Sequence, residues 1–297
     1  MIAENEFNEA LDYFDNEEYE EALEYFEKII NMDLGNQEAW FMKALTLINL
    51  KRDNEALEAI EVALELDPDD AEAWIKKAWI LELLHDVPEG LHAAQIALDL
   101  DKDHPDAVYL MGKFLLDSGN YSESVKYFKK YPENEFLFPD ALLYQGEALF
   151  KQGKSEEAEK ILDKLLSLES ENPEALNYKG QLLMSRGDCP GAIEFFQKAL
   201  DISPGFILSN FNLGIIEKES GNFHKALNYF DKVLKVDPEY AEAWYEKGIV
   251  LEKLQRKEDS VNAYKKFIHL APEKDDIPES LTNKVKEHLA RELPDMK

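Results

Sequence analysis

The sequence predicts an all-α protein, a solenoid of eight helix hairpins of 34 residues each, followed by a C-terminal capping helix. Two observations predict this class. The segments EAWFMKALTLINL (38–50), EAWIKKAWILELL (72–84) and EAWYEKGIVLEKL (242–254) follow one pattern, spaced by 34 and then by five times 34 residues. In addition, 45% apolar content with only 13 Gly and 12 Pro in 297 residues is typical of a chain rich in regular structure.

Eight consecutive windows, each with two amphipathic helices, cover residues 3–274 without an insertion. They are 3–36, 37–70, 71–104, 105–138, 139–172, 173–206, 207–240 and 241–274. The eighth position is always small: Ala10, Ala44, Ala78, Gly112, Gly146, Gly180, Gly214 and Gly248. The twentieth is small too: Ala22, Ala56, Gly90, Ser124, Ala158, Ala192, Ala226 and Ser260. Small residues let two backbones approach, so these positions predict where the two helices of a hairpin cross.

Turn residues separate the predicted helices. The fifteenth position is glycine in four windows, at Gly119, Gly153, Gly187 and Gly221, which predicts a left-handed residue at the end of the first helix. Proline stands near the end of four windows, at Pro68, Pro204, Pro238 and Pro272, where it stops the second helix or starts the next repeat.

This pattern resembles the tetratricopeptide repeat family, which has small residues at positions 8 and 20 and aromatic residues at positions 4 and 24. Position 4 is tryptophan at Trp40, Trp74 and Trp244, and position 24 is aromatic at Phe26, Phe128, Phe196, Phe230 and Tyr264. The resemblance implies a right-handed superhelix whose first helices line a concave groove. The third repeat departs from the pattern at Gly90 and Ala94, and the fourth at Tyr131-Pro132, so we expect these two repeats to be the least regular.

The last segment, 277–293, is predicted to form the capping helix. Apolar residues recur there at every fourth position, at Ile277, Leu281, Val285, Leu289 and Leu293, with charged residues between them. A helix with one apolar stripe suits the end of a solenoid, where the last apolar face must be covered.

Charge and composition limit the functions that are possible. With 33 basic and 62 acidic side chains the net charge is −29, and residues 1–100 alone carry −20. This excess opposes nucleic-acid binding and favours basic or neutral protein partners. The N-terminus has no signal-peptide pattern, no apolar run reaches the roughly 18 residues of a membrane helix, and there is one cysteine. We expect a cytoplasmic protein with no membrane contact.

Catalytic and cofactor patterns are weak. Residues 148–155, ALFKQGKS, fit a relaxed phosphate-loop pattern, but they continue a predicted helix into its turn and follow no strand. The six histidines show no metal-ligand spacing, and Cys189 has no histidine partner in sequence. We therefore expect neither an enzyme nor a bound cofactor or metal.

Ligand contacts in the family lie mainly at positions 2, 5, 9, 12 and 13 of the first helices. Transferred to this chain, they implicate Phe7, Leu11, Phe41, Leu45, Trp79, Tyr109, Phe211 and Tyr245, with Glu38 and Glu72 as an acidic rim. Large apolar and aromatic side chains dominate binding hot spots. Two alternatives remain open: aromatic residues at position 5 serve packing, and the acids at position 2 interact with the helix dipole.

The resulting hypothesis is a non-catalytic scaffold that binds a peptide or protein segment, with or without basic flanks, in the concave groove. The alternative is a structural protein that self-associates through its solenoid ends, so that monomer and weak homo-oligomer both stay open. The segment 131–139 interrupts the second helix of the fourth repeat and is either a local cap of the core, a hinge or a partner contact.

Overall fold

The structure is a computed structural model that describes residues 2–271 and 277–292, and side chains for residues 5–271 and 277–291. Pro272, the end of the eighth window after residue 271, and Leu293 lie outside the described residues.

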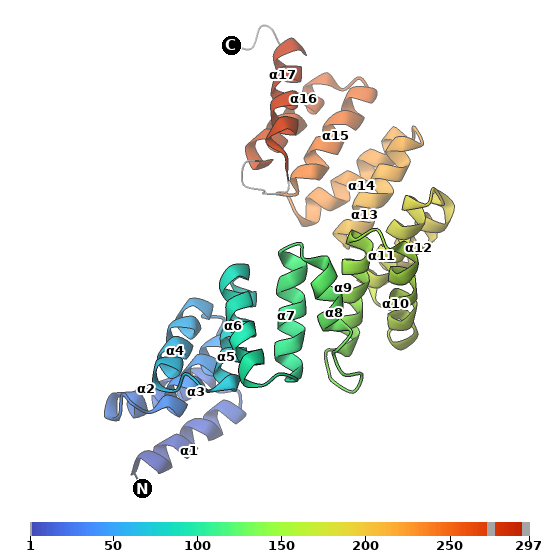
Figure 1. The fold of residues 1–297 in the computed structure, drawn as a ribbon. Helices are drawn as coiled ribbons and strands as arrows, with labels where there is room; N and C mark the ends of the chain where they lie inside the picture. The colour runs from blue at the N-terminus through green and yellow to red at the C-terminus, as the bar shows by residue number, and fades with distance from the viewer. Residues whose placement is uncertain (1, 272–276, 293–297) are drawn as a thin grey trace. The chain divides into compact units, whose positions relative to one another are not determined.

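Helices alone make up the regular structure of the described chain (Figure 1). Each predicted window holds a first and a second helix, and the all-α prediction is confirmed. The first helices are α1 (Ile2–Asp15), α3 (Gln37–Asn49), α5 (Ala71–Leu83), α7 (Pro105–Asp117), α9 (Phe138–Lys151), α11 (Pro173–Ser185), α13 (Ile207–Glu219) and α15 (Ala241–Lys253). The second helices are α2 (Tyr19–Met32), α4 (Asp53–Leu66), α6 (Val87–Leu100), α8 (Tyr121–Phe128), α10 (Ser155–Leu168), α12 (Cys189–Ile202), α14 (Phe223–Val236) and α16 (Lys257–Leu270). The final helix is α17 (Glu279–Glu292).

The chain forms two compact units, residues 1–161 and residues 162–297, with α10 divided between them. Consecutive helices pack on one another from α1 to α9 in the first unit and from α11 to α17 in the second. First helices also contact the first helices of neighbouring repeats: α3 with α5, α5 with α7 and α7 with α9 in one unit, and α11 with α13 and α13 with α15 in the other. No pair of second helices in the described chain makes comparable contact. A row of helices that approach one another more closely lies on the inner side of a curved stack, so the first helices form the inner face of each unit.

The two helices of a hairpin cross where the sequence places its small residues. A Cβ atom added at Gly180 or Gly214 would lie only 2.5 or 2.6 Å from the ring at position 24 of the same repeat, Phe196 or Phe230. In the fourth and eighth repeats the position-20 serine donates its hydroxyl hydrogen bond to the carbonyl of the position-8 glycine, at 2.8 Å and 3.0 Å. The buried ring therefore needs the space that a side chain at position 8 would occupy.

In the third repeat, the ring that fills the helix crossing comes from the following repeat. Ala94 provides no ring at position 24, and Phe114 of α7 fills the space against Gly90, where an added Cβ would lie 2.3 Å from the ring. Phe114 is fully buried, and α5 and α6 keep the usual lengths. The expectation that the third repeat is irregular is therefore wrong for its helices.

The fourth repeat is irregular, as expected. Its second helix, α8, has 8 residues where the other second helices have 14, and it ends before Pro132. Tyr131 turns into the core and is 4% exposed, whereas Phe136 is 92% exposed in the connection to α9. The helix α17 packs on the eighth repeat: Val285 of α17, and Ile277 just before it, are buried in one cluster with Phe267 of α16.

All eight hairpins use the same left-handed residue at position 15. The four predicted glycines have φ between 73° and 81°. The other four hairpins place a non-glycine residue in the same conformation, with φ between 57° and 63°: Glu17, Lys51, His85 and Gln255. These four turns are not predicted by the sequence pattern, because glutamate, lysine, histidine and glutamine at this position carry no turn signal of their own.

Ion pairs connect neighbouring repeats. Lysine at position 7 of one repeat binds the acid at position 25 of the preceding repeat, in Lys43–Glu27 (2.9 Å), Lys77–Glu61 (2.8 Å), Lys179–Asp163 and Lys247–Asp231 (2.6 Å). Where position 7 is Met111, Gln145 or Leu213, position 25 of the preceding repeat is Gln95, Lys129 or Gln197. Lysine at position 7 and an acid at position 25 of the preceding repeat are thus present together or absent together. A carboxylate placed at this interface without the lysine would lack a charge partner.

Position-4 tryptophan belongs to the same interface. The indole N–H of Trp40, Trp74 and Trp244 donates to the carbonyl of Leu34, Pro68 and Pro238, six residues earlier, at 3.1, 2.8 and 2.8 Å. The ammonium group of the position-7 lysine lies 5.0–5.5 Å from the centre of each indole ring. These tryptophans therefore hold consecutive repeats together.

We expect Gly214→Leu to lower the free energy of unfolding by at least about 1–3 kcal/mol, because its side chain overlaps the Phe230 ring. Gly205→Ala is the matched control, since its Cβ would meet only Val236, at 3.6 Å, and should shift stability by less than about 0.5 kcal/mol. Urea titrations of both variants measure this, and an unchanged midpoint for Gly214→Leu would contradict the crossing.

We expect Lys51→Gly to raise the free energy of unfolding by about 0.5–1 kcal/mol, because glycine removes the steric cost of a left-handed residue. Gly119→Ala should have the opposite sign, since nothing lies within 4 Å of its added Cβ and only the backbone conformation opposes it. Thermal unfolding of both variants checks the pair, and a destabilised Lys51→Gly would count against the shared turn.

Candidate partner-binding surface

The residues implied by the family resemblance all lie on first helices or at their first turns. Unit 1 holds six of the eight apolar and aromatic ones, on α1, α3, α5 and α7, whereas Phe211 and Tyr245 lie on α13 and α15 of unit 2. Glu38 and Glu72 are both exposed, in the first turns of α3 and α5, and Glu72 pairs with Lys76 at 2.7 Å.

Position 5 residues pack against the ring that fills the helix crossing. The ring centroids of Phe7 and Phe26 are 5.8 Å apart, as are those of Phe211 and Phe230, and Tyr245 lies 6.2 Å from Tyr264. Phe7, Phe211 and Tyr245 stay half-buried, so each covers the core with one side and keeps another side accessible. The packing alternative for position 5 thus has a direct structural basis.

The candidate residues at positions 5 and 9 of the first helices differ in polarity along the chain, and these positions are called the row below. Phe41, Leu11 and Leu45 are half-buried, and the first two pack on the cores of their own repeats. In the sixth repeat the row is polar: Asn177 is fully buried and accepts hydrogen bonds from Ser209 (3.2 Å) and Asn212 (3.1 Å) on α13. The aromatic side chains at position 5 are therefore interrupted in unit 2 by Asn177.

The largest aromatic group on the inner face joins α5, α7 and α9. Trp79 stacks on Tyr109 with ring centroids 5.7 Å apart and an interplanar angle of 27°, and Tyr109 meets Tyr144 at 6.2 Å. Tyr109 is 6% exposed, while Trp79 and Tyr144 are half-buried. Sequence reasoning missed Tyr144, which stands at position 6 and joins the cluster through a neighbouring helix.

Trp79 differs from the other three tryptophans in its hydrogen bonding. Within the described residues its indole N–H has no hydrogen-bond partner, whereas the indoles of Trp40, Trp74 and Trp244 each donate to a carbonyl. A half-buried indole with a free donor gives a partner both an apolar face and a hydrogen bond.

Two carboxylates and one ammonium group act on this aromatic group. Burial raises the pKa of Tyr109 above its ordinary value, and the charges of Asp140 and Glu82 raise it further. Burial also raises the pKa of Tyr144, which lies near the same two acids and has the Lys113 ammonium 5.2 Å from its ring centre. Aromatic rings beside carboxylates form a surface that attracts cationic side chains.

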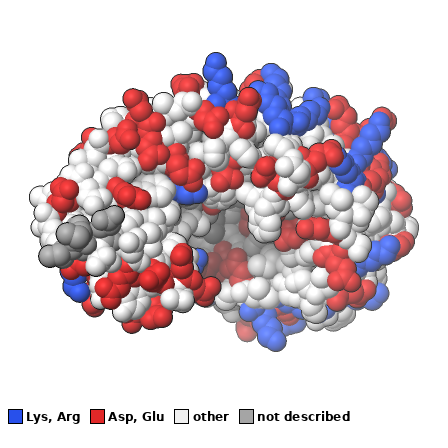
Figure 2. Space-filling view, turned by 90° about the horizontal axis from the view of Figure 1, so that it is seen from below, with Lys and Arg blue, Asp and Glu red and all other residues white. Residues whose placement is uncertain are grey.

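Acidic side chains dominate the visible face of the molecule in Figure 2, where Lys and Arg are confined to a few clusters. No group of histidine, cysteine and carboxylate side chains that could hold a metal occurs among the described residues.

The ALFKQGKS segment runs from the end of α9 through the turn at Gly153 into α10, so no strand precedes it. None of the described helices combines the length and apolar character that crossing a membrane requires.

Family comparison gives the class of the protein. One tetratricopeptide repeat model matches residues 75–141, 143–205 and 211–275, and a second matches residues 1–80. The chain belongs to the tetratricopeptide repeat family. Among curated proteins no match to this sequence was found.

Several solved structures share the fold at low sequence identity. A chain of the APC/C hetero-tetramer Cut9–Hcn1 is 14% identical with a TM-score of 0.67, and the match covers 90% of this chain and 52% of that one. Human IFIT1, solved as a dimer with PPP-AAAA, is 21% identical with a TM-score of 0.66, covering 97% and 74%. The C-terminal part of a repeat protein from Cytophaga hutchinsonii is 19% identical with a TM-score of 0.57, covering 80% and 97%. This chain thus spans about half of the Cut9–Hcn1 chain, and the likeness shows the fold alone.

We expect stability to fall as pH rises above about 10, where unfolded tyrosine loses its proton while buried Tyr109 keeps it. Tyr109→Phe removes one such group, so its loss of stability between pH 9 and 11 should be shallower than that of the wild type. Urea midpoints across this range measure the slope, with Tyr19→Phe, outside the cluster, as the matched control. Equal slopes for Tyr109→Phe and the wild type would contradict the burial of this phenol.

Proposed function

We propose that the protein is a non-catalytic protein-interaction scaffold that binds an extended or helical segment of a partner protein against the inner face of its first helices. The observation that carries this proposal is the aromatic group of Trp79, Tyr109 and Tyr144 on three successive first helices, with the free Trp79 indole donor at its edge. Trp79 and Tyr144 are partly exposed, and the buried Tyr109 supports them. Large, rigid aromatic side chains of this kind dominate protein-interface hot spots.

A basic side chain of the partner fits this surface best. Glu82 and Asp140 act on the cluster, Glu72 lies in the first turn of α5, and the first 100 residues carry a net charge of −20. A lysine or arginine would gain from both the ring faces and the carboxylates, and the long-range field would speed its approach. At this acidic surface the same field repels nucleic acid, so the partner proposed for it is a protein.

The remaining residues of the row extend the surface. Phe7, Leu11, Phe41 and Leu45 continue it along unit 1, with Glu38 at its rim, and Phe211 and Tyr245 offer a second, smaller stretch in unit 2. In this proposal the chain works in the cytoplasm, as a monomer or a weak homo-oligomer.

Peptides selected from a random display library on the immobilised full chain test the proposal. We expect the selected sequences to be enriched in lysine and arginine, and Trp79→Ala to weaken their binding by roughly 2 kcal/mol or more. Gln95→Ala, on the exposed side of α6, is the control that should leave the affinity unchanged. Equal affinity for the Trp79 variant would remove the inner-face site.

Light scattering over a concentration series separates the self-association alternative from partner binding. The scaffold proposal predicts a mass near 34.2 kDa for the isolated chain at low concentration. A larger, concentration-dependent mass that Trp79→Ala does not change would favour assembly through the solenoid ends.

A further inference from the structure

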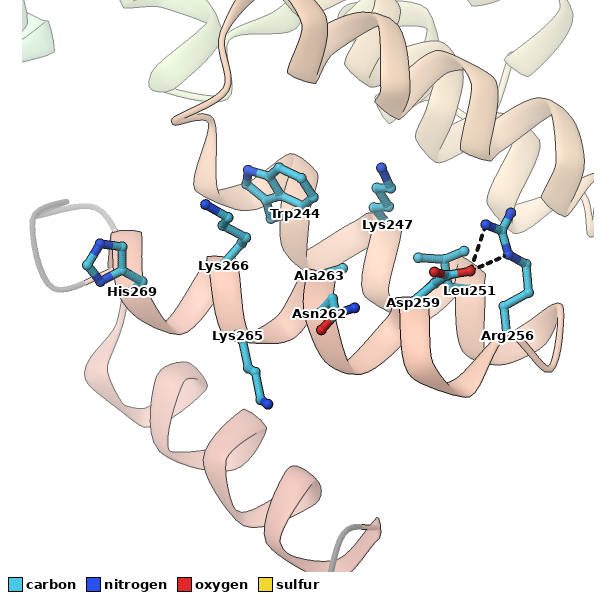
Figure 3. Close-up of a pocket in the computed structure, with 10 residues that line it drawn as sticks. All are labelled: Trp244, Lys247, Leu251, Arg256, Asp259, Asn262, Ala263, Lys265, Lys266 and His269. Atoms are coloured by element: carbon cyan, nitrogen blue, oxygen red, sulfur yellow. Dashed lines mark hydrogen bonds and ion pairs between the residues drawn. The ribbon is translucent and has the colours of Figure 1, made fainter. Parts of the chain in front are cut away.

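We propose that a groove between α15 and α16 is a second, separate binding site, which takes an acidic polypeptide segment. This site goes beyond the function proposed above, because it lies in unit 2 and has the opposite charge preference. The groove has a volume of about 560 Å³ and is lined by Trp244, Lys247, Leu251, Arg256, Lys266 and His269, among others (Figure 3).

The floor of this groove is held in place by the repeat interface. Trp244 donates its indole N–H to the Pro238 carbonyl, and Lys247 pairs with Asp231 while its ammonium group lies 5.0 Å from the indole centre. These contacts fix the indole and the lysine before any ligand arrives. A fixed floor lowers the entropy that a ligand must offset on binding.

The second and third repeats have the same floor but a different wall. Tryptophan, lysine and leucine recur at positions 4, 7 and 11 in all three repeats. Positions 26 and 29 of the second helix, which form the wall, are Val62 and Glu65 in the second repeat, Ile96 and Asp99 in the third, and Lys266 and His269 in the eighth. Lysine stands at position 26 in several other repeats too, but only the eighth repeat has it together with a tryptophan at position 4, so that the indole floor meets a lysine in the wall.

Lys266, the lysine of this wall, has no carboxylate partner within residues 2–271 and 277–292. Lys266 and His269 form no ion pair there, and Arg256 at the other end is paired with Asp259 at 2.7 Å (Figure 3). Position 25, an acid in four other repeats, is here Lys265, and residues 251–297 hold ten acidic and ten basic side chains, whereas the rest of the chain carries −29. Neighbouring cations repel one another, and a bound anion relieves that repulsion.

The spacing of the basic residues favours a polypeptide over a single small anion. Arg256 and His269 stand thirteen residues apart along one helix, a distance of about 20 Å. An extended segment of about six residues spans the same length. Carboxylates along such a segment would pair with the exposed Lys266 and would compete with Asp259 for Arg256 at the other end. Each such contact weakens with salt.

Fluorescence polarisation with a fluorescein-labelled peptide of six glutamates tests the site on the full chain. We expect binding that Lys266→Glu weakens at least about tenfold, or about 1.4 kcal/mol, and that rising salt also weakens. Lys130→Glu is the matched control, since Lys130 stands at the same repeat position in the fourth repeat and the substitution changes the net charge equally. It should change the affinity less than about twofold.

Lys266→Val, which installs the residue of the second repeat, should weaken the peptide without adding a negative charge, and unchanged circular dichroism would show that the variant folds. Trp79→Ala should leave the binding of the glutamate peptide intact. The experiment can therefore contradict one proposed site without contradicting the other.

Four results would overturn the proposal. Equal weakening by Lys266→Glu and Lys130→Glu would mean a general charge effect. Tighter binding of a six-lysine peptide would reverse the charge preference. Competition by inorganic phosphate or by a hexamer of thymidylate at concentrations where free glutamate has no effect would point to a phosphate site. Sedimentation that shows Lys266-dependent self-association would make a second copy of this chain the occupant.

Discussion

The close crossing of the two helices in each hairpin is the constraint on which the rest of the structure depends. A glycine or alanine at position 8 leaves space for a ring from position 24, and in the fourth and eighth repeats a serine hydroxyl donates across the same point. The position-5 side chain then covers that ring, as Phe211 covers Phe230. Packing therefore decides which parts of the first helix remain for the inner face, and the candidate binding surface is the accessible edge of the core rather than a separate layer of residues.

The 34-residue period explains why so much of the fold could be predicted from the sequence. Features that do not recur with this period could not be predicted. Eight hairpins, their crossings and four turns follow from residues that recur every 34 positions. Phe114 could not be assigned to Gly90, because the ring comes from the next repeat and its position has no aromatic counterpart in the family pattern. Tyr144 was missed for the same reason. The left-handed Lys51 has no turn signal in its side chain, although its register with Gly119 would have revealed it.

The ion pairs between repeats follow a simple pattern in the sequence, although the sequence-based predictions did not include them. Lysine at position 7 and an acid at position 25 of the preceding repeat occur together at four interfaces and are both absent at three. The eighth repeat is followed by α17, and its position 25 is Lys265. The same rule that neutralises charge inside the array thus leaves cations near its end, beside the groove of α15 and α16. In a chain with a net charge of −29, the two proposed surfaces would have opposite preferences, the aromatic one for basic partners and the groove for acidic ones.

The most direct measurement of the central claim, that the inner face of unit 1 binds the partner through Trp79, is an NMR titration of the four tryptophan indole N–H signals with a selected basic peptide that carries a spin label. The account predicts that the Trp79 signal, assigned with Trp79→Phe, shifts and broadens first. The signals of Trp40, Trp74 and Trp244 should change little, because their N–H groups are already bound to backbone carbonyls at repeat interfaces. An unchanged Trp79 signal at saturating peptide, with broadening at any of the other three, would contradict it.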